Sequence, residues 1–298
     1  MSSPTATRPF LDEPLGESAV LAHRLAGEHC RVQGMSRESC AWYHGFWQFM
    51  RLMGIAKTSG GHVDFLAKEL RVAARSARFA HLLIAGAADY SMAACALWAY
   101  RLEGAELGLS MVDRCDTPLA LARWYGARCG ASVKTYCADI LDFEGPQKFD
   151  VVMTNSFLGY FDPPARAKLF ARWANLLRPG GRLLLTNRIR PGKGHVPVGF
   201  TPDEACAFAD TVRREAARLP TPTLEPDELV RMAQAYAERF RSVPLHSSAE
   251  IVALIEANGF RIERLDTATA TGRANGALLA GPTLAEATDY VRVVAVRS

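Results

Sequence analysis

Three residues with distinct chemistry, Gly86, Asp113 and Asp139, each come at or just after the end of a short apolar run. A glycine in such a place lets the backbone approach a ligand without a Cβ collision. A carboxylate there can accept hydrogen bonds from both hydroxyls of a ribose, the role we expect for Asp113. A second carboxylate can accept from an adenine amino group, which we expect of Asp139, with Ile140 against the ring.

The turn after Gly86 differs from a dinucleotide-binding loop. Such a loop needs glycine at positions 86, 88 and 91, but Ala88 and Ser91 stand at the last two. Asp89 would also put a carboxylate where a pyrophosphate lies. The sequence therefore disfavours NAD and FAD. Asp89 is well placed to cap the helix that follows, and capping does not exclude a ligand beside it.

Residues 42–47 (WYHGFW) form an unusually aromatic segment. At helical spacing Tyr43, Phe46, Trp47 and Met50 share one apolar face, so core packing is the first interpretation. The alternative is that the segment closes a substrate pocket, with Tyr43 and Trp47 on the substrate and His44 as a candidate base.

Other polar motifs receive structural interpretations. Asp162, followed by two prolines, is expected to be a helix N-cap with proline at the first helical position. The basic cluster 188–193 (RIRPGK) is interpreted as a solvated loop, with an anion site as the alternative. No H-x-x-H, C-x-x-C or carboxylate pair occurs, so we expect no metal site.

Short apolar runs alternating with amphipathic helical segments must position these residues. This alternation is typical of a parallel sheet with helices on both faces. The runs expected to be strands are 81–85, 107–112, 132–137, 149–154, 182–186, 261–265 and 290–296. The segments expected to be helices between them are 91–101, 117–128, 163–178 and 248–258.

Two helical regions lie outside this alternation. Residues 17–75 have helical periodicity throughout and follow a proline-rich segment, 1–16, that we expect to be a flexible tail. Residues 188–246 interrupt the alternation and contain two expected helices, 203–219 and 226–241. We therefore expect an N-terminal helical lid region, 17–75, and an α/β domain, 76–298, with a helical insertion.

Composition excludes several classes of protein. The 298 residues are 49% hydrophobic and 22% charged, which argues against disorder. Thirty-five Lys and Arg against 31 Asp and Glu give +4, too small and scattered an excess to suggest nucleic-acid binding. The longest apolar stretch, 79–100, is broken by His81 and Asp89, so we expect no membrane span. Seven cysteines without a signal sequence indicate a reduced, cytoplasmic protein.

The runs FAHLLIAGAADYS, LSMVDRC, YCADILDF, FDVVMTNSFLGYF and LLRPGGRLLL, taken in this order, resemble the class I S-adenosylmethionine-dependent methyltransferases. The resemblance covers residues 79–187 and resumes at 247–298. The first motif departs from the family, with Ile84 where an acidic residue is usual and Ala88 and Tyr90 where glycines are usual. The resemblance implies a Rossmann-like α/β fold with a doubly wound, mostly parallel, seven-stranded sheet, and S-adenosylmethionine as cofactor.

The resemblance also implies which residues contact the cofactor. Asp113 would bind the ribose and Asp139 the adenine amine, while residues 155–157 would face the sulfonium, whose charge aromatic faces can contact. The expected cofactor contacts are Gly86, Ala87, Ala88, Asp113, Arg114, Asp139, Ile140, Asn155, Ser156 and Phe157.

The function expected from the resemblance is methyl transfer to a small-molecule acceptor enclosed by the two helical regions. Tyr43, Trp47 and Tyr160 are the expected substrate contacts, and His44 and Tyr160 are the candidate bases if the acceptor must lose a proton. Two alternatives stay open: an aminopropyltransferase-like enzyme on the same fold, and a non-catalytic nucleoside-binding scaffold. We expect neither a nucleic-acid nor a membrane partner, and a homodimer is possible.

Overall fold

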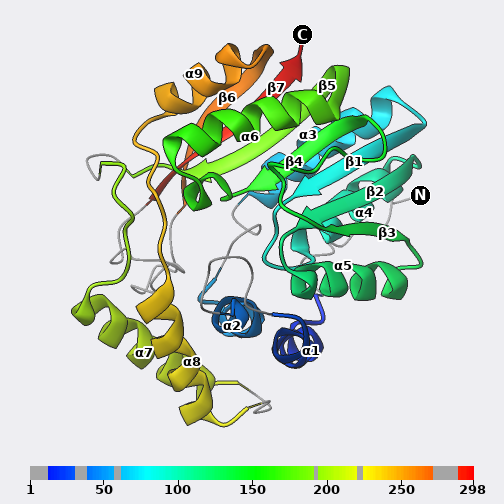
Figure 1. Ribbon diagram of the computed structural model, residues 1–298. Helices are drawn as coiled ribbons and strands as arrows, with labels where there is room; N and C mark the ends of the chain where they lie inside the picture. Colours follow the sequence, from blue (N-terminus) through cyan, green and yellow to red (C-terminus); the bar gives the residue numbers. More distant parts are fainter. Residues whose placement is uncertain (1–12, 31–38, 57–61, 191–193, 220–223, 271–287) are drawn as a thin grey trace, which may run out of the picture.

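A seven-stranded sheet with helices on both faces forms the centre of the molecule (Figure 1). The computed structural model describes residues 13–30, 39–56, 62–190, 194–219, 224–270 and 288–298. The strands are β1 (Phe79–Ala85), β2 (Glu106–Asp113), β3 (Val133–Cys137), β4 (Phe149–Asn155), β5 (Leu177–Arg188), β6 (Phe260–Ala270) and β7 (Thr288–Arg297). The helices are α1 (Leu15–His29), α2 (Ala41–Leu52), α3 (Val63–Ser76), α4 (Ser91–Leu102), α5 (Asp116–Arg128), α6 (Pro163–Leu176), α7 (Pro202–Ala216), α8 (Pro226–Arg239) and α9 (Ser248–Ala257), with a short 3₁₀ helix, η1 (Leu158–Tyr160).

The sheet order is β3-β2-β1-β4-β5-β7-β6, and every neighbouring pair is parallel except the two pairs that contain β7. The chain winds outward from β1 to β3, then returns to the other side of β1 with β4. The order therefore reverses between β1 and β4, which is where such sheets bind ligands beyond their carboxyl ends. The predicted doubly wound, mostly parallel fold is confirmed.

Alternating side chains of the central strands divide the core into two layers. Leu82 and Ile84 of β1 face the layer covered by α3, α4 and part of α5. Leu83 and Ala85 of the same strand face the layer covered by α6 and α9. This period of two with both faces apolar explains why the strands appear in the sequence as nearly continuous hydrophobic runs.

The remaining helices gather at the carboxyl edge of the sheet (Figure 1). Residues of α2, α7 and α8 share one hydrophobic cluster, which also includes Ala19 of α1. Phe46, Phe49 and Tyr236 are completely buried in it. We call α1, α2, α7 and α8 the helical cap. The cap brings together the two regions that stood outside the strand–helix alternation of the sequence.

The largest difference from the expected elements lies between α6 and β5. The sequence predicted a helix to residue 178 and a strand from 182, but the helix ends at Leu176 and the strand begins at Leu177. Leu177 is buried and pairs with Phe149, and the register then shifts before Arg182 pairs with Val151. Gly180, at φ +75°, takes up this irregularity, so the Pro-Gly-Gly turn lies inside the strand.

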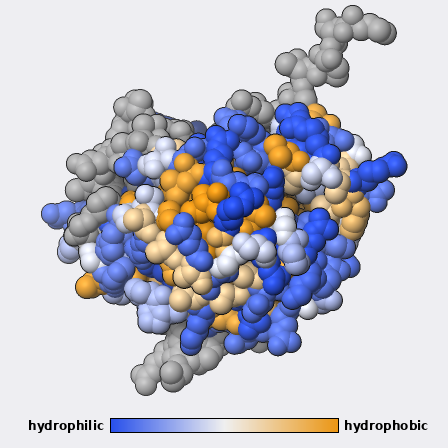
Figure 2. Space-filling model, turned by 90° about the horizontal axis from the view of Figure 1, so that it is seen from above, coloured by the Kyte–Doolittle hydropathy of each residue, from blue (hydrophilic) through white to orange (hydrophobic). Residues whose placement is uncertain are grey.

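Most of the expected tail, residues 1–12, and the segment 271–287 between the last two strands lie outside the described residues. Leu15 and Gly16 at the end of the expected tail already belong to α1. Among the described helices, none is long and apolar enough to cross a membrane. On the face remote from the helical cap, Figure 2 shows hydrophobic residues gathered near the middle of a largely hydrophilic surface.

Candidate functional site

A cavity of about 370 Å³ lies between the carboxyl edge of the sheet and the helical cap. Its floor comes from the ends of β1, β2, β4 and β5 and from the loop after β3, and its roof from α2 and α8. Every site residue predicted from the sequence lines this cavity: Tyr43, His44, Trp47, Gly86, Ala87, Ala88, Asp113, Arg114, Asp139, Ile140, Asn155, Ser156, Phe157 and Tyr160.

Gly86 is required both by its backbone conformation and by its neighbour. Its φ is +71°, which residues with a side chain rarely adopt. A Cβ at this position would lie 2.2 Å from the Phe157 ring. The Gly86 amide also donates to the Val112 carbonyl at 3.0 Å, which ties the turn after β1 to the end of β2. The glycine therefore lets the β1 turn and the β4 loop approach each other under the cavity.

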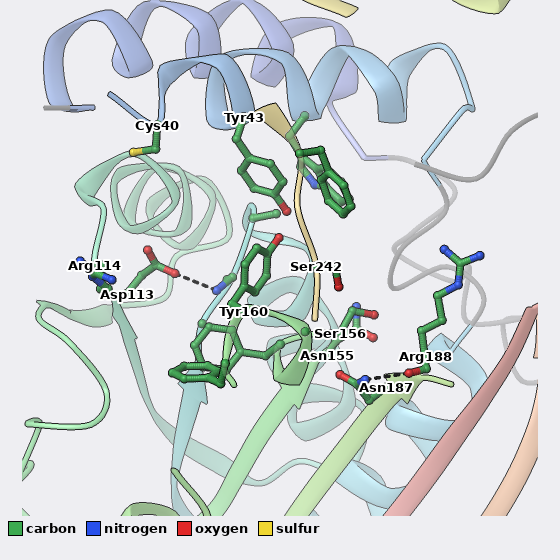
Figure 3. Close-up of a pocket in the computed structure, with 18 of the residues that line it drawn as sticks. Cys40, Tyr43, Asp113, Arg114, Asn155, Ser156, Tyr160, Asn187, Arg188 and Ser242 are labelled. Carbon is green, nitrogen blue, oxygen red and sulfur yellow. Dashed lines mark hydrogen bonds between the residues drawn. The ribbon is translucent and has the colours of Figure 1, made fainter. Parts of the chain in front are cut away.

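Asp113 links the β1 turn to the end of β2. Its Oδ2 accepts from the Ala87 amide at 3.0 Å (Figure 3), and its Oδ1 accepts from the Cys115 amide at 2.8 Å. Burial raises the pKa of this carboxyl, while the His44 charge and the two amides oppose the shift. Each carboxylate oxygen can accept a further hydrogen bond, so Asp113 keeps capacity for a ligand hydroxyl.

Asp139 and its neighbours form the end of the cavity beside β3. The Asp139 Oδ1 accepts from the Leu141 amide at 2.9 Å, which closes a local turn. The Arg114 Nε lies 3.7 Å from Asp139 Oδ2, so the guanidinium and the carboxylate face each other across the loops after β2 and β3. Ile140 presents an apolar side chain to the cavity next to this pair.

Asp89 makes more contacts than a helix-capping residue alone would make. Its Oδ1 accepts from the Ser91 amide at 2.7 Å, so it does bind the first turn of α4. Its Oδ2 accepts from Trp47 Nε1 at 2.9 Å and lies 3.0 Å from Arg51 Nη1. Asp89 therefore anchors α2 to the β1 turn, and Arg51 balances its charge. Arg51 also pairs with Glu13, whose pKa is raised by burial.

The loop after β4 has a strained backbone held by the neighbouring strand. Ser156 has a φ of +53°, the only positive φ of a non-glycine residue in the described ranges. Its amide donates to the Thr186 carbonyl at 2.8 Å, and the Asn155 side chain accepts from the Thr186 hydroxyl. Asn187 accepts from the Leu158 amide at 3.1 Å. Such strain is held in place at sites that must present a particular geometry to a ligand.

Aromatic rings form the roof and one wall of the cavity. Tyr43 is stacked between Trp47 and Tyr236, with ring centroids at 5.4 and 5.9 Å. Figure 3 shows Tyr43 descending from α2 with its hydroxyl directed at Tyr160, which rises from the loop after β4. Phe157 lies beside Tyr160, with centroids 6.2 Å apart. The aromatic segment 42–47 thus serves both expected purposes: Phe46 packs in the core, while Tyr43 and Trp47 face the cavity.

Neither of the two candidate bases, His44 and Tyr160, is in a state to accept a proton at neutral pH. Tyr160 is half-exposed, and desolvation of its hydroxyl at the cavity wall raises the pKa of the phenol, so it is protonated at neutral pH. Burial alone would lower the pKa of His44, but hydrogen bonds with Cys115 and Cys40 outweigh it and raise the pKa to about 10. A protonated imidazole cannot accept a further proton. The His44 ring is 7% exposed, and its Nδ1 lies 3.6 Å from Cys30 Sγ.

Two arginines after β5 also line the cavity. Burial and the adjacent Arg190 lower the pKa of Arg188 to about 10, and burial lowers that of Arg190. Figure 3 shows Arg188 across the cavity from Asp113. This part of the basic cluster is therefore half-buried and faces the cavity, so the solvated-loop interpretation is wrong for both arginines; residues 191–193 lie outside the described residues.

Sequence reasoning missed the contribution of α8 and the segment that follows it. Tyr236 and Ser242 line the cavity together with Phe240 and residues 243–245. The Tyr236 hydroxyl is buried and has no hydrogen-bond partner among the described residues. The separation of about 80 residues from the β4 loop leaves no local signal that these residues meet the site. The expected N-cap, Asp162, is confirmed by its bond from the Ala165 amide.

Comparison with known proteins bears on the domain and the fold. Residues 89–181 match the family model of the methyltransferase domain. The 1,6-didemethyltoxoflavin-N1-methyltransferase of Burkholderia thailandensis, solved with 1,6-didemethyltoxoflavin and S-adenosylhomocysteine, is 18% identical with a TM-score of 0.51, over 100% of this chain and 93% of that one. The magnesium protoporphyrin IX methyltransferase of Synechocystis PCC 6803 with bound S-adenosylmethionine is 15% identical with a TM-score of 0.49, over 85% and 91%. No curated protein matches the sequence.

At 18% identity the Burkholderia structure supports the fold alone, and the domain match supports the enzyme class. Residues 89–181 therefore form a methyltransferase domain, and the chain has the Rossmann-like α/β fold that its motifs predicted.

Proposed function

We propose that this protein transfers the methyl group of S-adenosylmethionine to a small acceptor held between the strand ends and the helical cap. The observation that carries the proposal is that the residues predicted to bind the nucleoside and an aromatic wall line one and the same cavity. A cavity of about 370 Å³ with an apolar lining and a few polar groups suits small ligands.

The residues at the strand ends fit the cofactor. Asp113 has free acceptor capacity for the ribose hydroxyls, and Asp139 with Ile140 suits the adenine. The absence of a side chain at Gly86 lets the Phe157 ring pack directly against the turn after β1. When bound, the cofactor supplies an electrophilic methyl carbon on a positively charged sulfur. The rings of Tyr43, Phe157 and Tyr160 offer faces that favour such a charge.

The chain's own contribution to the reaction is alignment. A displacement at a methyl carbon requires the acceptor atom in line behind it, and fixed walls supply that geometry. Because the pKa values of His44 and Tyr160 are both raised, neither is ready to remove a proton at neutral pH. We infer that the acceptor atom already carries its lone pair, as a heterocyclic nitrogen or an ionised oxygen does.

The acceptor is proposed to carry an acidic group. Arg188 and Arg190 bring two like charges to one wall of the cavity, and an anionic ligand would relieve their repulsion. The buried Tyr236 hydroxyl offers a donor for a second polar group of the acceptor. The same arginines weaken the aminopropyltransferase alternative, since a polyamine is cationic.

The helical cap is proposed to be the lid, which keeps water from the acceptor. In this proposal α1 and α2 of the region 17–75 and the insertion 188–246 enclose the pocket, while α3 packs on the sheet beside α4. Residues 76–187 and 247–298 bind the cofactor. The cluster shared by α2, α7 and α8 supports it, because helices from both regions pack as one unit.

The experiment is a transfer assay with S-adenosylmethionine labelled at the methyl group and a panel of planar acids, each paired with its neutral amide. The proposal predicts label transfer to members of the acid series and little transfer to the matched amides. Binding of S-adenosylhomocysteine without transfer to any acceptor would favour the scaffold alternative.

A further inference from the structure

Beside the cofactor edge of the cavity, three thiols and an imidazole meet. The Sγ atoms of Cys30, Cys40 and Cys115 and one ring nitrogen of His44 all lie within 4.8 Å of one another. Cys30 and Cys115 are 8% and 3% exposed and His44 is 7% exposed, whereas Cys40 is half-buried at the rim of the cavity. Neither the cofactor nor the acceptor, as proposed above, requires this cluster.

Two of the ligand distances in the cluster are close to those of a tetrahedral metal site. Cys30 Sγ lies 3.5 Å from Cys115 Sγ and 3.6 Å from His44 Nδ1. Zinc bonds of about 2.3 Å to sulfur and 2.0–2.1 Å to nitrogen imply ligand separations of about 3.8 Å between sulfurs and about 3.6 Å between sulfur and nitrogen. The four side chains thus already stand around a position where the ion would lie.

The backbone presents these side chains from three separate segments. Cys40 is the N-cap of α2 and His44 lies one turn further on, so they share a helix face. Cys30 is the C-cap of α1, and Cys115 is the N-cap of α5. The Ser39 hydroxyl donates to the Cys30 carbonyl at 2.6 Å and accepts from the Ala41 amide at 3.1 Å, which ties the two cap helices together.

A second layer of contacts surrounds the cluster, as in protein metal sites generally. The Thr117 Oγ1 lies 3.2 Å from Cys30 Sγ and donates to the Leu25 carbonyl at 3.4 Å. The Cys115 amide donates to Asp113 Oδ1 at 2.8 Å, so the cluster begins two residues after the residue predicted to bind the ribose. Core packing or a single disulfide would leave unexplained why a third thiol and an imidazole converge on the same point.

We propose that Cys30, Cys40, His44 and Cys115 bind one Zn²⁺ ion that fastens α1 and α2 to the end of β2. Three cysteines and one histidine complete the tetrahedral shell, so the ion is structural and leaves no position for the acceptor. Binding releases the thiol protons and the extra proton of the His44 imidazole to solvent, as the thiolates and the neutral imidazole bind the ion. A metal-bound His44 is not a base, which replaces the role that the sequence predicted for it.

Metal content tests this proposal independently of methyl transfer. Protein purified under reducing conditions should contain about one zinc per chain by elemental analysis. The metal-free protein should bind Co²⁺ with the visible bands of a tetrahedral site and a thiolate-to-cobalt charge-transfer band. Absence of both zinc and the charge-transfer band from reduced, folded protein would overturn the proposal, even if S-adenosylhomocysteine binds.

Variants locate the ligands. Cys40→Ser should weaken Co²⁺ binding at least about tenfold and lower the charge-transfer band by about one third, one thiolate of three. Cys206→Ser, at an exposed position on α7, is the matched control and should bind Co²⁺ as the parent does. Equal binding by both variants contradicts the assignment. If Cys40→Ser does not fold, the spectrum of the parent still decides.

Counting thiols in the denatured, metal-free protein tests the competing disulfide. All seven cysteines should react with a thiol reagent when no reductant is added after metal removal under anaerobic conditions. Two missing thiols, mapped by mass spectrometry to Cys30 and Cys115, would mean that a disulfide occupies the site and would overturn the proposal.

Discussion

At the scale of single residues, the site depends on close approaches that leave little freedom of substitution. Gly86 has both a positive φ and the Phe157 ring 2.2 Å from where a Cβ would be. Gly104 has a similar φ of +65°, with nothing within 4 Å of its Cβ position. The pair therefore separates the energy of backbone strain from that of the steric clash.

We predict that Gly86→Ala destabilises the protein more than Gly104→Ala does. Strain at a positive φ should lower the free energy of unfolding by about 1 kcal/mol in both variants. Overpacking against Phe157 should add about 1–3 kcal/mol in Gly86→Ala alone. Urea unfolding of the three proteins measures both values, and equal destabilisation would mean that the Phe157 ring moves aside freely.

The sequence predicted the strand-end residues well, because each is local to its own strand. Gly86, Asp113 and Asp139 all line the cavity, and the order of the apolar runs was enough to bring them to one edge. Contacts between distant segments leave no comparable pattern in the local sequence. Arg51 pairs with Asp89 across 38 residues, and Cys115 meets His44 across 71, so neither the ion pair nor the metal cluster was predicted.

At the scale of elements, a buried histidine joins the start of α3 to β7. His62 precedes α3 and is 2% exposed, its Nδ1 accepts from Arg292 Nε of β7 at 3.2 Å, and its ring lies 4.4 Å from that of Tyr290. Burial, with the nearby Arg292 charge, lowers the pKa of His62 to about 4. The fold thus favours the neutral ring.

We predict a pH-dependent loss of stability from His62. Its stabilising contribution is fully present above the unfolded pKa of 6.5 and is lost as the pH falls towards 4, because the unfolded chain binds the proton more tightly. The loss should reach about 3 kcal/mol across this window. Urea unfolding at several pH values should show a flatter profile for His62→Gln than for the parent.

His195→Gln, at an exposed position, is the control for removing one imidazole. Parallel profiles for the parent and His62→Gln would refute the assignment of this pH dependence to His62.

Tyr236 of α8 places a hydroxyl in the roof of the cavity that makes no hydrogen bond with any described residue. We predict that Tyr236→Phe raises the KM for the acceptor several-fold, with the affinity for S-adenosylhomocysteine and the melting temperature unchanged. Because this hydroxyl makes no hydrogen bond with a described residue, its removal breaks none there and removes only a donor from the acceptor. Steady-state kinetics, calorimetry and thermal unfolding test the three parts, and an unchanged KM would remove this hydroxyl from acceptor recognition.

At the scale of the whole molecule, two regions far apart in the sequence close over one edge of a sheet. The strand–helix alternation was sufficient to predict the sheet, because periodicity and turn residues are local. The packing of α2 against α7 and α8 could not be predicted in this way, because it depends on which apolar faces remain uncovered once the sheet is complete. The roof of the cavity comes from that packing, so the sequence predicted the strand-end side of the cavity in more detail.

The central claim is that the carboxyl edge of this sheet binds S-adenosylmethionine through Asp113. Titration calorimetry with S-adenosylhomocysteine tests it most directly, with NAD as the comparison ligand and Asp210→Asn, on the exposed face of α7, as the control variant. We predict one site per chain for S-adenosylhomocysteine, no measurable heat with NAD, and Asp113→Ala weaker by about 2 kcal/mol or more. Tighter binding of NAD, or an Asp113→Ala variant that binds S-adenosylhomocysteine as well as the parent does, would contradict the claim.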